Sequence, residues 1–82
     1  MSAVALHARV REELERHGVA VSAGDTPAVL RERLNDLYLE EVRKLRERQR
    51  RGEIPLKQYA QHVAGLRDRF PLLGLPLERW DE

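Results

Sequence analysis

The feature that most constrains this 82-residue chain is a run of 24 residues, 28–51, that contains neither glycine nor proline. Pro27 stands before the run and Gly52 after it, and these residue types are typical of the first turn and the end of a helix. A helix over 26–51 is roughly 39 Å long at a rise of 1.5 Å per residue. Because a chain of this size builds one small core, we expect this helix to be the central element.

Two shorter helices are expected on either side of the central one. Apolar residues recur at spacings of three and four over residues 3–17 and 55–70, which predicts an amphipathic helix in each segment. Ser2 is the expected N-cap of the first, and Gly18 is expected to end it. Short connections make neighbouring helices antiparallel. The sequence therefore predicts one all-α domain over 1–82, a small three-helix antiparallel bundle. Its expected core is Leu6, Val10, Leu14, Leu30, Leu34, Leu37, Val63, Leu66 and Phe70.

The middle of the central helix carries three consecutive apolar residues, Leu37, Tyr38 and Leu39. Together they cover about 200° of the helix circumference. The two shorter helices, if each has about 15 residues, overlap beside residues 36–41. We therefore expect the middle of the central helix to be buried on most sides.

The segment 72–80 is too apolar for a solvated tail, because five of its nine residues are large apolar ones. Pro71 just before it and Pro76 within it stiffen the segment and lower the entropy lost when it docks. We expect Trp80 to pack on the Leu30–Leu34 flank of the central helix, in its own chain or in a partner chain. The apolar residues that three short helices do not cover form a candidate partner interface: Val42, Leu45, Leu72, Leu73, Leu75, Leu77 and Trp80.

Residues 43–51 carry six positive charges and one negative charge, which leaves a net charge of −4 for the rest of a chain whose total is +1. Such a basic stripe can neutralise phosphates and bind nucleic acid. No aromatic residue interleaves with the cations, so stacking on single strands is not indicated. The other interpretation is a solvated helix end, where the helix dipole favours each cation by roughly 0.3–1 kcal/mol. The candidate nucleic-acid contacts are Arg43, Lys44, Arg46, Arg48, Arg50 and Arg51.

The residues that usually carry catalysis or bind metal are scarce in this chain. It has no cysteine, three histidines and two serines, so disulfides, thiolate zinc sites and cysteine nucleophiles are excluded. No histidine lies four residues from another or three residues after a glutamate, the spacings of common helical metal motifs. Neither a serine triad nor a glycine-rich phosphate loop is present. We expect a non-enzymatic protein without metal, cofactor or small-molecule substrate.

Two parts of the chain resemble known helical motifs. Residues 10–18 and 26–34 resemble the SAP motif, whose two helices around a glycine-containing loop bind DNA. The connection is longer here, and the second helix extends far beyond the motif. Residues 42–66 resemble a short C-terminal oligomerisation hairpin of bacterial proteins, with Gly52 ending the first helix. Pro55 stands where that family usually has a capping threonine or serine.

These observations favour a helical protein-interaction module, with a homodimer as the expected assembly. The alternative is a small nucleic-acid-binding protein that uses the basic segment. The absence of cysteine, of a long apolar span and of a secretory signal favours a cytoplasmic protein with no membrane contact. Thirteen arginines against two lysines, with a single asparagine, are compatible with a thermophilic source.

Overall fold

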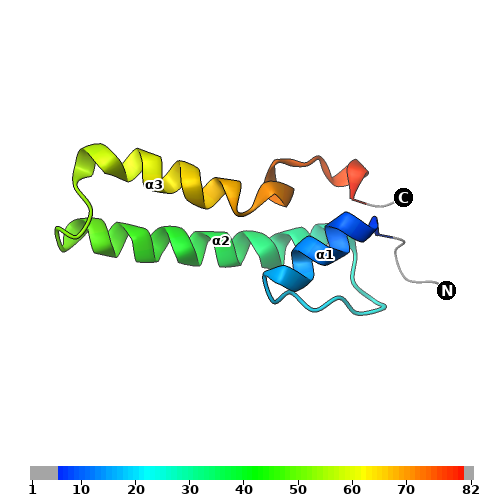
Figure 1. Ribbon diagram of the computed structural model, residues 1–82. Helices are drawn as coiled ribbons and strands as arrows, with labels where there is room; N and C mark the ends of the chain where they lie inside the picture. The colour runs from blue at the N-terminus through cyan, green and yellow to red at the C-terminus, as the bar shows by residue number, and fades with distance from the viewer. Residues whose placement is uncertain (1–5, 81–82) are drawn as a thin grey trace. The chain divides into compact units, whose positions relative to one another are not determined.

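The computed structural model describes residues 6–80, which contain three α-helices and no strand (Figure 1). This confirms the all-α class. Two short 3₁₀ helices, Pro71–Gly74 and Leu77–Arg79, follow the last α-helix. The α-helices are α1 (Ala8–Arg16), α2 (Pro27–Arg50) and α3 (Leu56–Asp68).

The start of α1 differs from the expected start. The helix begins at Ala8, while Ser2, the expected cap, and the other residues before Leu6 lie outside the described part. Leu6 and His7 are not helical. The backbone N–H of His7 donates instead to the carbonyl oxygen of Trp80 at 3.1 Å. At His7 a long-range backbone hydrogen bond therefore takes the place of the helical one that periodicity predicts.

The described residues form two units. The first unit contains the chain up to Asn35 together with the segment from Leu72 onward, and the second unit is Asp36–Pro71. α2 contributes its first turns to the first unit and its remainder to the second.

The first unit has a well-filled core. Eight apolar side chains are buried in it, four of them with no exposed surface; five of the eight belong to the expected core, and Trp80 was also expected to pack. The buried residues are Leu6, Val10, Leu14, Val19, Leu30, Leu34, Leu72 and Trp80.

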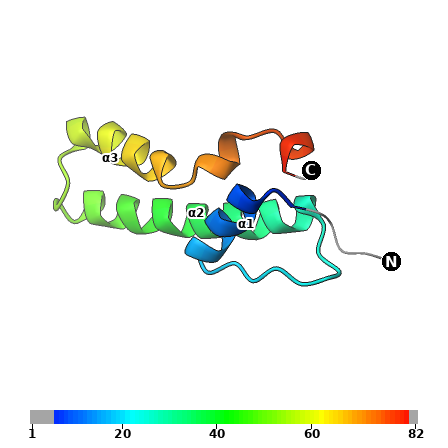
Figure 2. The same cartoon turned by 45° about the vertical axis from the view of Figure 1, so that its right-hand side comes forward.

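The antiparallel course expected for α1 and α2 is not seen. α1 lies obliquely across the first turns of α2, and the connection 17–26 carries the chain back before α2 begins (Figures 1 and 2). The connection has ten residues, long enough to reverse the chain direction before the second helix starts.

The second unit is a helical hairpin in which the chain leaves along α2 and returns along α3 (Figure 2). The rings of Tyr38 and Phe70 meet edge to face, with their centroids 5.5 Å apart. Only Ile54, Leu66 and Phe70 are buried apolar residues of this unit.

The expectation that the middle of α2 is buried on most sides is wrong. Leu37 is 39% exposed and Leu39 is 48% exposed, while Val63, another expected core residue, is half-buried. The prediction required two neighbours of about 15 residues, and α1 has nine.

The seam of α3 is buried only at its C-terminal end. Leu56, the first seam residue, is 73% exposed, whereas Leu66 is buried. The end of α2 and the turn that follows it, residues 46–53, contain no apolar side chain that could cover Leu56. The first turn of α3 therefore has no apolar partner at the end of α2 or in the turn up to residue 53.

Gly18 and Gly52 end α1 and α2 in the same way. Each adopts a left-handed backbone conformation, with φ of +79° and +81°. After α2, the N–H of Glu53 donates to the carbonyl of Arg48 at 2.9 Å, and the N–H of Gly52 donates to that of Gln49 at 3.1 Å. This is the Schellman arrangement that satisfies the last carbonyls of a helix.

Replacing Gly52 with valine is expected to lower the free energy of unfolding by about 1 kcal/mol or more, because a β-branched residue is strained at positive φ. A Cβ at this position meets no atom within 4 Å, so the loss of stability comes from backbone strain and not from a steric clash. Gly65 is the matched control, since it lies inside α3 with equally open space around it. Gly65→Ala is expected to raise stability by roughly 0.5–1 kcal/mol. Urea unfolding checks both, and an unchanged Gly52→Val midpoint would contradict the assignment.

Candidate interaction surface

The tail is held on the start of α2 by polar contacts within the first unit. Arg31 donates from Nη2 to the carbonyl oxygen of Leu73 at 3.3 Å. The indole Nε1 of Trp80 donates to the carbonyl oxygen of Leu75 at 3.1 Å. Trp80 has no exposed surface. Of the two alternatives that the sequence leaves open, the tail packs on α2 of its own chain, in the unit that contains Leu30 and Leu34.

This packing divides the residues of the candidate partner interface between the two units. Leu72 and Trp80 are buried in the first unit, and the leucines at 73, 75 and 77 are half-buried there. The tail already covers a surface of its own chain. Val42 and Leu45 are half-buried in the second unit, where they remain partly accessible.

One side of α2 in the second unit is apolar and open. At about 100° per residue, Tyr38, Leu39, Val42 and Leu45 fall within an arc of about 120° of the helix. Leu39 is exposed and the other three are half-buried. We call these four residues the α2 edge. Leu39 is not among the interface residues that the sequence predicts. A helical projection would have placed Leu39 on the face of α2 opposite to the buried Leu30 and Leu34.

A groove of about 240 Å³ lies between α2 and α3 of the second unit. Four of its seven lining residues are charged and two are leucines. Among the described residues, no cluster of three or more potential metal ligands is found. Its lining residues are Glu41, Lys44, Leu45, Arg48, His62, Leu66 and Arg69.

All six candidate nucleic-acid contacts, five on α2 and Arg51 directly after it, are exposed, as such a role requires. Most of them are also engaged with carboxylates, in exposed pairs that each contribute little to stability. Arg46 is the one of the six without an ion pair in the described part of the chain. The ion pairs are Arg43 with Glu40 (3.5 Å), Lys44 with Glu41 (3.1 Å), Arg48 and Arg51 with Glu53 (3.4 and 3.1 Å) and Arg50 with Glu47 (3.6 Å).

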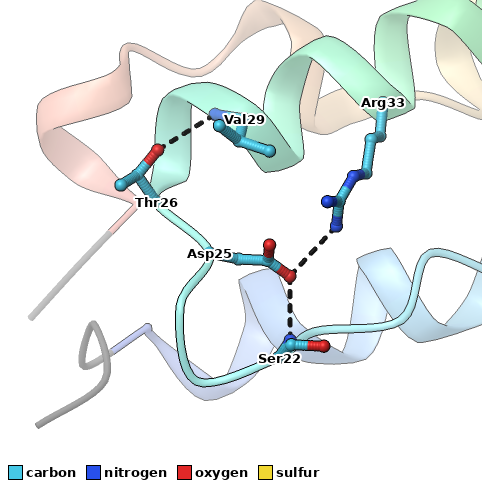
Figure 3. A network of polar contacts seen from close by, with 5 residues as sticks. All are labelled: Ser22, Asp25, Thr26, Val29 and Arg33. Atoms are coloured by element: carbon cyan, nitrogen blue, oxygen red, sulfur yellow. Dashed lines mark hydrogen bonds and ion pairs between the residues drawn. The ribbon is translucent and has the colours of Figure 1, made fainter.

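The carboxylate of Asp25 organises the connection before α2 (Figure 3). Its Oδ2 accepts a hydrogen bond from the backbone N–H of Ser22 at 2.9 Å and one from Nη1 of Arg33 at 3.0 Å. These two interactions, the Ser22 bond first, lower the pKa of Asp25 below its ordinary value of 3.8. Thr26 caps α2, because its Oγ1 accepts from the backbone N–H of Val29 at 3.2 Å. These contacts join the connection to the first turns of α2.

Because the folded pKa of Asp25 is depressed, its contribution to stability is present above the unfolded pKa and is lost as the pH falls through the folded pKa. Asp25→Asn is therefore expected to lower the Tm near pH 6, and the difference from the parent should shrink below about pH 4. Thr26→Ala is the control. It removes a neutral cap worth about 1 kcal/mol, so its Tm difference should stay constant with pH. A constant difference for Asp25→Asn as well would contradict the assigned role.

No protein-family model, curated protein or solved structure matches this chain. The two motif resemblances of the sequence thus find no support from a family match. Within the described residues, no helix combines the length and the apolar character that crossing a membrane requires.

Proposed function

We propose that this chain is a non-enzymatic helical interaction module that self-associates as a homodimer through its second unit. The observation that carries the proposal is the contrast between the two units. The first buries eight apolar side chains and the second buries three.

The second unit leaves apolar surface open along both of its helices. Leu37, Leu39 and Leu56 are exposed, and five further apolar residues are half-buried. A segment of about 40 residues or fewer seldom builds a sufficient core without help, and oligomerisation is one common source of that help. Contiguous exposed apolar surface is typical of protein-interaction sites. The half-buried residues are Tyr38, Val42, Leu45, Tyr59 and Val63.

The mass in solution tests the proposal. Light scattering after size-exclusion chromatography is expected to give about twice the chain mass of 9.6 kDa, with dissociation on dilution. A mass equal to one chain at every concentration would overturn self-association.

The second candidate function is nucleic-acid binding through the basic segment of α2, favoured by the exposure of its six cations. The same purification distinguishes the two functions, because co-purified nucleic acid raises the ratio of absorbance at the nucleic-acid maximum to that at the protein maximum. Binding to a DNA duplex through these cations should weaken steeply with salt. Binding that is absent at low salt would remove this candidate.

A further inference from the structure

The charges along α2 of the second unit lie in two blocks of opposite sign. Residues 36–41 contain three carboxylates and no cation, a net charge of −3, whereas residues 43–51 carry a net charge of +5. Val42 is the single residue between the blocks. Two ion pairs, Glu40–Arg43 and Glu41–Lys44, cross this boundary within the chain. The acidic start and the basic end of the helix segment nevertheless keep opposite net charges.

A helix with opposite charges at its two ends is complementary to an antiparallel second copy of itself. The acidic block of one chain then faces the basic block of the other, and a parallel alignment places like charges together. A twofold axis near Val42 gives this alignment, and the numbers of facing residues then add up to 84. In this register residues 36–41 of one chain lie at the same level along the helix axis as residues 43–48 of the second copy.

The apolar residues of the α2 edge also pair with one another in the register in which facing residue numbers add up to 84. Leu39 faces Leu45 of the second copy, and Val42 faces its own counterpart. These residues lie on one side of the helix, so that side is self-complementary, as a twofold contact requires. Leu39 and Val42 also remain accessible on the single chain.

Arg46 supports the antiparallel contact independently of the charge blocks and of the apolar residues. It falls within the same arc of α2, and it is the cation of the basic segment for which the described residues hold no ion pair. In the antiparallel register it faces Tyr38 of the second copy, which is half-buried and whose ring also packs edge to face on that of Phe70. A guanidinium over an aromatic ring is a favourable contact.

We propose that two copies of this chain associate through an antiparallel contact of α2 with α2, centred on Val42 and formed by the α2 edge and Arg46. This inference rests on the proposed function, since it names the partner and the register of the same self-association.

Single cysteines test the register, because the natural chain has none. Val42→Cys is expected to form a disulfide-linked dimer in a glutathione redox buffer, since the two Cα atoms approach to the 4.4–6.8 Å that a disulfide requires. Glu47→Cys, on the exposed outer face of the same helix, is the matched control. In this register its two copies are ten residues apart along the axis, roughly 15 Å, and should remain unlinked. Circular dichroism confirms that both variants are folded.

A mixture of Leu39→Cys and Leu45→Cys chains should link to each other more than either links to itself. If the reduced parent is a dimer but Val42→Cys links no better than Glu47→Cys, the register is wrong while the proposed function stands. If the parent is a single chain at all concentrations, both proposals fail.

Discussion

Replacement of Trp80 with alanine is expected to lower the free energy of unfolding by about 3–5 kcal/mol, the usual loss when a buried tryptophan is truncated. The indole has no exposed surface and donates a hydrogen bond to Leu75. An 82-residue chain has a total stability of about 4–12 kcal/mol at 0.05–0.15 kcal/mol per residue. The substitution thus removes a large part of the stability of the first unit. Urea unfolding followed by circular dichroism measures the loss.

Trp80→Phe is the matched control for this change. It retains most of the apolar ring and loses the Nε1 donor, so its effect should be clearly smaller than that of alanine. An alanine variant that unfolds within a few tenths of a kcal/mol of the parent would contradict the packing of the tail.

Leu34→Ala and Leu37→Ala form a second test, with the same chemical change on one helix. Leu34 has no exposed surface and belongs to the first unit, whereas Leu37 is 39% exposed in the second. We expect Leu34→Ala to lower stability by about 2–5 kcal/mol and Leu37→Ala by at most about 1 kcal/mol.

Chemical unfolding of the two variants under identical conditions gives this comparison directly. Equal losses would mean that the middle of α2 is buried after all, as the consecutive apolar residues of the sequence suggest. A larger loss for Leu37→Ala would contradict the assignment of Leu34 to a filled core.

The helices and their ends were predictable because their signals are local. Spacings of three and four mark the apolar stripes, and glycine at the end of α1 and α2 marks the left-handed turn that both Gly18 and Gly52 adopt. The burial of Leu14, Leu30 and Leu34 follows from the same stripes.

The start of α1 was not predictable, because its cause is not local. His7 pairs with the carbonyl of Trp80, a residue more than 70 positions away in the sequence, and such tertiary contacts override helix propensity. The exposure of Leu37 has the same origin, since it depends on the actual length of α1.

The candidate surface was predictable in part. Periodicity identified Val42 and Leu45 as poorly covered, and both are half-buried in the structure. The tail residues were grouped with them because composition shows that a segment is apolar and does not show which surface it covers. Leu39 was missed because it was counted as part of a buried middle.

The positions of Trp80 and of the two tyrosines give each unit its own spectroscopic probe. The single tryptophan lies in the first unit, and both tyrosines lie in the second. Indole fluorescence therefore reports on one unit, and tyrosine absorbance largely on the other. Coincident transitions for the two signals would mean that α2, the helix shared by both units, transmits cooperativity along the whole chain. Separate transitions would mean that α2 frays at the junction of Asn35 and Asp36 while one unit stays folded.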